Sequence, residues 1–220
     1  MAAAVSELCK IAPWLWPYPG LEDWDDFSAI HGTTPPRAPG VSLLLAFSQA
    51  GGEIWVLTAD PGHVLTQPAN LSDDLQKGWR QLAGTVSRAL PWMVGSIRKV
   101  SRRVPRVQGW RCLMLPKQEA PPPTAVLQGE SFGLSMAVAM ASLVTRLPVR
   151  ADAACSACVD RATGELRPVS SLLEKAWAVA VHAPGVECLF VSDDQPDADC
   201  AAVESETGLQ VIRHASLSTA

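Results

Sequence analysis

A serine between two glycines is the feature of this sequence that most directly suggests chemistry. The stretch GESFG, residues 129–133, centres on Ser131 and leads directly into an apolar run of small residues. A serine hydroxyl becomes a strong nucleophile only when a neighbouring base takes its proton. Where a loop enters a helix, free backbone N–H groups can also stabilise an oxyanion. The plainer interpretation is that Ser131 only caps the helix.

One candidate for the base is a histidine. GESFG matches the G-x-S-x-G nucleophile elbow of the α/β-hydrolases, in which an acid and then a histidine follow the serine. Asp193, Asp194 or Asp199 followed by His214 would satisfy that order. The consecutive prolines at 121–123 make a poor central strand before the motif, although this design needs one there. An esterase that uses His214 stays open as an alternative.

The other candidate for the base is Lys175. Ser171 and Glu174 have the spacing of a capping box, which predicts a helix that begins at Ser171 and carries Lys175 in its first turn. The helix dipole at that end, together with burial among apolar neighbours such as Trp177, favours the neutral form of a lysine. A neutral amine is what a general base requires. The plainer interpretation is a surface lysine paired with an acid.

Taken together, these stretches resemble the proteolytic domain of Lon proteases, which are Ser-Lys peptidases. GESFG resembles the family's serine motif, and TRLPVRADAA continues like its "tgrpvradva". TGELRPVSSLLEKAWAVA is similar to the family's "rGxVlPIGGLKEKllAA". The resemblance covers residues 40–216 and is firmest over 108–195. It puts Ser131 at the nucleophile position and Lys175 at the base position, 44 residues apart (175 − 131).

The resemblance also implies roles for the residues around this pair. Ser156 falls where the family has a threonine whose hydroxyl supports the lysine. Gly129 and Gly133 match the glycines that flank the nucleophile. Glu130 replaces a proline and Phe132 replaces an alanine, so the motif departs from the family on both sides of the serine. We expect Glu130 to bring an acid near the oxyanion region and Phe132 to narrow the cleft.

For the protein as a whole, the resemblance implies an α+β fold with mixed sheets and flanking helices. The implied activity is that of an ATP-independent serine endopeptidase, because the sequence has no G-x-x-x-x-G-K-[ST] phosphate loop. Its substrate would be a protein or peptide, with no cofactor and no metal. A separate ATPase or sensor chain and a homo-oligomer are the expected partners. A non-catalytic Lon-like scaffold or oligomerisation domain is a further alternative.

The order of the predicted elements independently indicates an α/β or α+β domain. The predicted strands are 41–47, 53–58, 109–116, 155–160, 166–169, 187–192 and 209–214. The predicted helices are 72–90, 131–145, 170–182 and 197–206. Residues 1–38 form a segment rich in Pro and Trp, which is a candidate docking element, and residues 39–220 form the predicted peptidase domain.

Composition excludes several classes of protein. The hydrophobic content of 48% supports a real core, and the longest apolar runs are far too short for a membrane span. The N-terminus lacks the features of a secretion signal, so we expect a cytoplasmic protein. A net charge of −4 argues against nucleic-acid binding. Cys155 and Cys158 have CxxC spacing, but no second pair or nearby histidine completes a zinc site, so buried small residues are the favoured interpretation.

Overall fold

The computed structural model describes residues 39–48, 51–60, 71–89, 107, 109–115, 126, 128–145 and 149–217. All structural statements below concern these residues. The predicted docking segment, residues 1–38, lies outside them.

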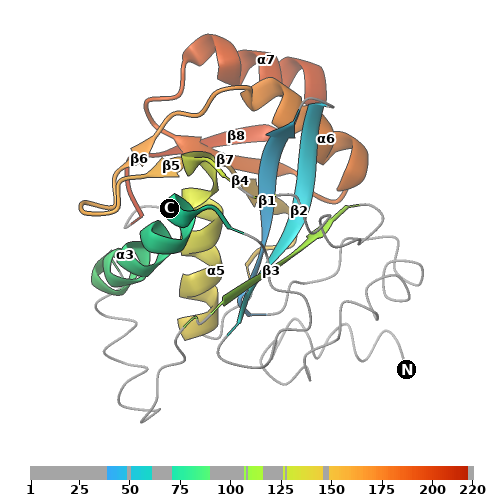
Figure 1. The fold of residues 1–220 in the computed structure, drawn as a ribbon. Helices are drawn as coiled ribbons and strands as arrows, with labels where there is room; N and C mark the ends of the chain where they lie inside the picture. Colours follow the sequence, from blue (N-terminus) through green and yellow to red (C-terminus); the bar gives the residue numbers. More distant parts are fainter. Residues whose placement is uncertain are drawn as a thin grey trace.

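A six-stranded mixed sheet runs through the centre of the protein, and the predicted α+β class is confirmed (Figure 1). Its strands are β1 (Val41–Ser48), β2 (Gly51–Asp60), β3 (Gly109–Met114), β4 (Ala153–Cys155), β7 (Cys188–Ser192) and β8 (Gln210–His214). The spatial order is β3-β2-β1-β4-β7-β8. β1, β2 and β3 pair antiparallel, whereas β4, β7 and β8 run parallel to β1. The carboxyl ends of β1, β4, β7 and β8 therefore lie at one edge of the sheet.

Helices cover both faces of this sheet (Figure 1). They are α3 (Asp73–Ala89), α5 (Gly133–Thr145), α6 (Leu172–His182) and α7 (Asp197–Thr207). Side chains of β1 alternate between the two faces, as a strand requires. Leu43 and Leu45 join the core under α6 and α7, whereas Leu44 and Ala46 join the core under α3 and α5. The sheet thus separates two apolar cores.

The chain leaves the sheet where a single strand is predicted. Instead of one strand over 155–160, β4 ends at Cys155 and a separate strand, β5 (Cys158–Val159), pairs with β6 (Leu166–Arg167). The last link to the sheet is the hydrogen bond from the Ser156 N–H to the Phe190 carbonyl, at 2.9 Å. The predicted single strand is wrong because residues 158–159 find their partner in β6 rather than in β7.

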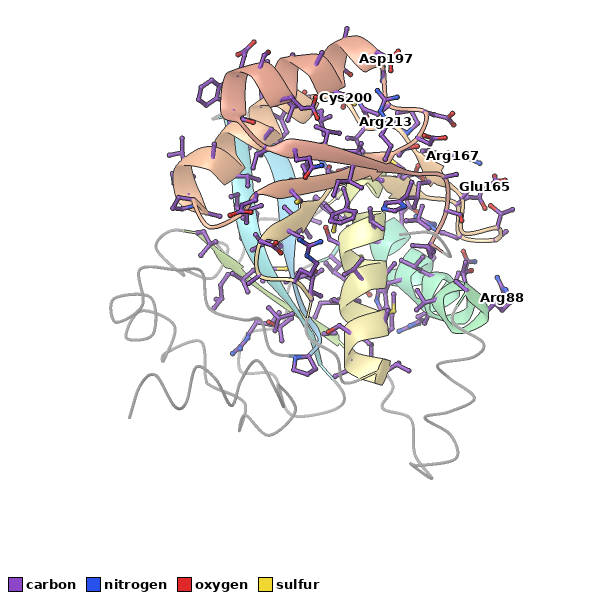
Figure 2. The ribbon with its side chains drawn as sticks, turned by 180° about the vertical axis from the view of Figure 1, so that it is seen from behind. Arg88, Glu165, Arg167, Asp197, Cys200 and Arg213 are labelled. Carbon is purple, nitrogen blue, oxygen red and sulfur yellow. The ribbon has the colours of Figure 1, made fainter. Side chains whose placement is uncertain are left out.

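The β5–β6 hairpin is fixed to α3. Thr85 Oγ1 donates to the carbonyl of Arg161, and Arg88 donates to the carbonyl of Ala162 at 3.0 Å. Figure 2 shows Glu165 and Arg167 of this hairpin between Arg88 on α3 and Arg213 on β8. These hydrogen bonds hold the hairpin in a fixed position against α3.

The other predicted elements agree with the structure to within a few residues. The Ser72 cap of α3 is confirmed, because Ser72 Oγ accepts a hydrogen bond from the Leu75 N–H at 3.3 Å. The predicted helix from Ser131 begins as a short 3-10 turn, η3 (Glu130–Phe132), and continues as α5.

The start of β2 lies directly against α6. A Cβ atom on Gly52 would lie 2.0 Å from the backbone carbonyl oxygen of Glu174 and 3.1 Å from the backbone nitrogen of Lys175. Only glycine fits there, since the neighbouring atoms belong to backbone and cannot move independently. The first turn of α6 is thus positioned by the sheet beneath it.

Gly52→Ala should therefore lower the free energy of unfolding by about 3 kcal/mol, because the new methyl group must displace α6. Gly84→Ala is the matched control. Its Cβ would meet only Arg88 Nη1, at 3.8 Å, inside helix α3. That change should raise the free energy of unfolding by about 0.5–1 kcal/mol. Urea unfolding of both variants measures the difference, and equal stabilities would contradict this close contact.

Candidate functional site

Ser131 lies in the middle of η3, immediately before α5. The glycines on either side have separate structural reasons. Gly129 has a φ of 109°, a conformation that favours glycine. Gly133 approaches β5 so closely that a Cβ there would lie 2.9 Å from the backbone nitrogen of Val159. The motif therefore holds the serine turn tightly against the β5–β6 hairpin.

The interpretation of Ser131 as a structural cap is wrong. The residue that caps η3 is Gly129, and no side chain hydrogen-bonds to the end of this turn. Within the described part of the chain, the Ser131 hydroxyl has no hydrogen-bond partner at all. The side chain is half-buried.

Glu130 and Phe132, the two residues that differ from the Lon serine motif, lie in different environments. Glu130 directly precedes the serine and is exposed. Phe132 is only 5% exposed and packs in the core with Leu44 and Met136. The expectation that Phe132 narrows the cleft is therefore wrong, because its ring fills the space beneath the turn.

Lys175 lies in the first turn of α6, and its predicted burial is confirmed. The side chain is 3% exposed, and its Nζ donates a hydrogen bond to the Ser170 carbonyl at 3.0 Å. Burial lowers the pKa of Lys175 below its ordinary value, while the neighbouring Cys158 and Glu174 act in the opposite direction. The surface ion pair offered as the plainer interpretation is therefore wrong.

The helix that carries Lys175 begins where predicted but not by the predicted contact. Ser171 precedes α6, yet it has φ 54° and ψ 40° and makes no side-chain capping hydrogen bond. It is the sole residue other than glycine with a positive φ in the described ranges. This left-handed conformation turns the chain so that the Ser170 carbonyl faces Lys175. The capping-box prediction is thus wrong in its hydrogen bonding.

Ser156 lies beyond the end of β4 and is 1% exposed. Its Oγ is buried without a hydrogen-bond partner among the residues that the structure describes. Ala154 and Cys158, two positions before and after it, both pack in the core that contains α6. Since alternate residues of an extended chain share a face, we infer that Ser156 is directed toward the same helix. Leaving a buried hydroxyl unpaired is costly.

Cys158 is a member of this site that the sequence reasoning missed. Burial is the main cause of a raised pKa of the Cys158 thiol. The charge of Glu130 raises that pKa further, whereas Lys175 and Arg167 lower it. Cys158 is therefore close enough to feel both the serine turn and the lysine. In the sequence, the position of Cys158 two residues after Ser156 was the signal that could have indicated its place near the candidate site.

The site is thus built from three carboxyl ends of strands that run in the same direction. Gly52, which pairs with Phe47 near the end of β1, supports α6, and Ser156 follows β4. Gln195 follows β7 and hydrogen-bonds to the segment before α6. Ligand sites in sheets with parallel strands favour this edge. Within the described residues, no hydrogen bond joins Ser131 to Lys175 or to Ser156.

His214 lies at the same edge of the sheet, on the face that α5 covers and away from Lys175. Its ring stacks on Phe190 at 5.5 Å between centroids, and Phe190 packs toward α5. Its Nε2 is buried without a partner in the described ranges. No side-chain hydrogen bond links the ring to Ser131 or to a carboxylate there. The contacts needed for an acid-histidine-serine triad are not formed between these residues.

No protein-family model matches this chain, and no curated protein matches it either. In the portion of the chain that the structure describes, no helix is long and apolar enough to cross a membrane. The same portion contains no group of three or more His, Cys, Asp or Glu side chains placed to hold a metal ion. Cys155 and Cys158 are not joined by a disulfide.

The buried amine of Lys175 makes stability depend on pH. Its pKa in the folded protein lies below the ordinary value of 10.5, so the unfolded chain binds more protons between the two values. The contribution of Lys175 to stability therefore rises with pH through that window. Below the window, burial of the charged amine opposes folding.

We predict that Lys175→Met is more stable than the wild type at pH 7, by about 1 kcal/mol. The advantage should shrink as pH approaches 10.5 and be smallest above it, where the amine of the wild type is neutral in both states. Lys77→Met, at an exposed position on α3, is the matched control and should change stability by less than about 0.5 kcal/mol at either pH. A constant advantage across this range, measured by urea unfolding, would contradict the assignment.

Proposed function

We propose that this protein is a Lon-like serine endopeptidase in which Ser131 is the nucleophile and Lys175 the general base. The observation that carries the proposal is the buried Lys175 amine, which donates to the Ser170 carbonyl and has a lowered pKa. Structural lysines rarely occupy such positions, because burial of the charge is costly. A lysine with a perturbed pKa is typical of an active site.

The proposed reaction has two halves. Ser131 Oγ attacks the carbonyl carbon of the scissile peptide as the Lys175 Nζ accepts its proton. The tetrahedral intermediate then collapses, and Lys175 returns the proton to the leaving amine. In the second half, water attacks the acyl-enzyme with Lys175 again as base. Free backbone N–H groups of the serine turn are the proposed oxyanion donors.

Ser156 supports the lysine in this proposal. Its buried Oγ lies on the α6 side of the chain and has no other partner in the described residues. A hydrogen bond between Ser156 and the Lys175 Nζ would satisfy the hydroxyl and orient the amine toward Ser131. The cost of leaving this hydroxyl unpaired is the physical reason to expect that contact during catalysis.

The proposed substrate is a flexible or exposed segment of a protein. The sequence contains no phosphate loop for a nucleotide, so no unfolding driven by ATP is expected from this chain. A substrate segment that is already extended needs no unfolding before cleavage. We further propose a homo-oligomer and a separate ATPase or sensor chain as partners, with residues 1–38 as the docking element. Pull-down of a partner should be lost when residues 1–38 are deleted.

The test of the catalytic pair is a series of variants assayed on unstructured peptides and small esters. Ser131→Ala and Lys175→Met should each lower kcat/KM for peptide by about 10³-fold or more. A serine-reactive phosphonate probe should label the wild type at Ser131, as read by mass spectrometry. Ser205→Ala, at an exposed position on α7, is the matched control and should retain full activity.

His214→Ala separates the proposal from its main competitor. Under the Ser-Lys mechanism this variant keeps activity, provided that it remains folded. Loss of ester cleavage with His214→Ala but not with Lys175→Met would instead support an α/β-hydrolase-type esterase. Absence of cleavage and of probe labelling in every form, with an intact oligomer, would support a non-catalytic scaffold.

Ser156→Ala should separate activity from stability. The change removes a buried hydroxyl that has no partner in the described structure, so the free energy of unfolding should stay equal or rise by up to about 1 kcal/mol. Peptidase activity should nevertheless fall by about 10-fold, since the amine loses its second partner. Ser156→Thr restores the hydroxyl and should recover activity. A parallel loss of stability and activity would contradict the proposed role.

A further inference from the structure

Gln195 is a fully buried polar residue outside the serine and lysine elements. It follows β7 and is 2% exposed. Its Oε1 accepts a hydrogen bond from the Val169 N–H at 2.9 Å, and its Nε2 donates to the Val169 carbonyl at 3.0 Å. The carboxamide therefore pairs with both backbone groups of one residue, as a neighbouring strand would.

A third hydrogen bond fixes the orientation of this carboxamide. Gln195 Nε2 also donates to Asp199 Oδ2, at 2.9 Å, from the first turn of α7. An ionised carboxylate only accepts, so the nitrogen must face Asp199 and the oxygen must face the Val169 N–H. Both amide hydrogens and the oxygen are thus used, and the side chain cannot turn over without losing all three contacts.

Val169 stands one residue before the carbonyl that Lys175 contacts. The chain runs from Val169 to Ser170, whose carbonyl accepts from the Lys175 Nζ at 3.0 Å, and on to Ser171 in its left-handed conformation. Ser170 itself is exposed, so nothing in its own burial holds its carbonyl in place. The direction of that carbonyl depends on Val169 before it and on Ser171 after it.

We propose that Gln195 is a positioning residue for Lys175, which holds Val169 so that the Ser170 carbonyl keeps the lysine amine in place for catalysis. The inference rests on the proposed Ser-Lys function. It adds a residue from the α7 side of the protein that neither the serine motif nor the lysine motif contains. Gln195 does not touch the reacting atoms, and its effect passes through Val169 and Ser170.

The charged and titratable groups that surround the amine come from several elements. Cys158 on β5 and Glu174 on α6 both act on Lys175 directly. Glu130 and Arg167 act on Cys158. Among the elements packed against α6, β2 carries Glu53, which accepts from Ser48 and Trp55, and α7 carries Glu206, which accepts from Trp177. None of these groups is altered by a change at Gln195.

Gln195→Met tests the proposal, since methionine has a similar shape but none of the three hydrogen bonds. The released segment should admit water to the amine and let the pKa of Lys175 rise toward its ordinary value. At pH 7, kcat should fall about 10-fold with KM within about twofold. The loss should shrink as the pH approaches and passes 10.5, where the amine of the variant becomes neutral again. Gln210→Met, at an exposed position on β8, is the matched control and should match the wild type.

A second measurement does not depend on peptidase activity. In the Ser131→Ala background, lysines labelled with ¹³C at Cε are titrated by NMR, and the Lys175 signal is assigned by its loss in Lys175→Met. Gln195→Met should move the titration midpoint of Lys175 to higher pH, while the other lysines stay unchanged. Asp199→Ala, which removes only one of the three contacts, should shift it in the same direction by less, and it serves if Gln195→Met does not fold.

The outcomes separate this inference from the proposed function. An unshifted Lys175 midpoint, or a loss of kcat that is equal at every pH, would overturn the positioning role and leave Gln195 as a structural residue. A wild type without peptidase activity would overturn the proposed function, and the NMR titration would still decide whether Gln195 controls the amine.

Discussion

Burial of one lysine amine is the constraint on which the rest of the site depends. An ammonium group inside a protein loses its hydration, and the N-terminal end of a helix adds an unfavourable positive potential. Lys175 meets both conditions, with the Ser170 carbonyl as its hydrogen-bond acceptor. Gly52 in β2 packs beneath the first turn of α6, and Gln195 holds the segment before it. Together these contacts enclose the amine. The burial that results lowers the pKa of Lys175.

The two candidate reacting residues belong to opposite faces of the sheet. Ser131 precedes α5 on one face, and Lys175 lies in α6 on the other. Elements on opposite faces can meet only beyond the ends of the strands, so a site between them must lie at an edge. The short strand β5 spans this junction, because Cys158 packs toward α6 and Val159 packs toward α5. The close approach at Gly133 then brings the serine turn against β5. Departure of the chain from the sheet after β4 is thus what permits the arrangement.

Local patterns in the sequence predicted the elements, and long-range pairing decided what they did not predict. Alternation along β1 and the Ser72 cap of α3 are local, and both are confirmed. The capping box at Ser171 has the right spacing, but tertiary contacts of Val169 with Gln195 impose a different backbone conformation there. Val169 and Gln195 are 26 residues apart, and no local sequence pattern indicates that they are in contact. Lys175 was predicted as the base from the resemblance to Lon and from the need for a neutral amine. That need also led to the prediction that its side chain is buried.

The hydrogen bond to Ser170 and the burial of the amine have separate consequences for catalysis. A protonated lysine has three N–H donors and no lone pair, whereas the neutral amine has two donors and one lone pair. Either form can donate to the Ser170 carbonyl, so that contact orients the nitrogen without selecting its charge. Burial favours the neutral form, since it penalises the charged one. In the proposed mechanism one donor stays on Ser170, the other turns to Ser156, and the lone pair accepts the proton of Ser131. The same geometry with a hydrated amine would hold a lysine that cannot act as a base.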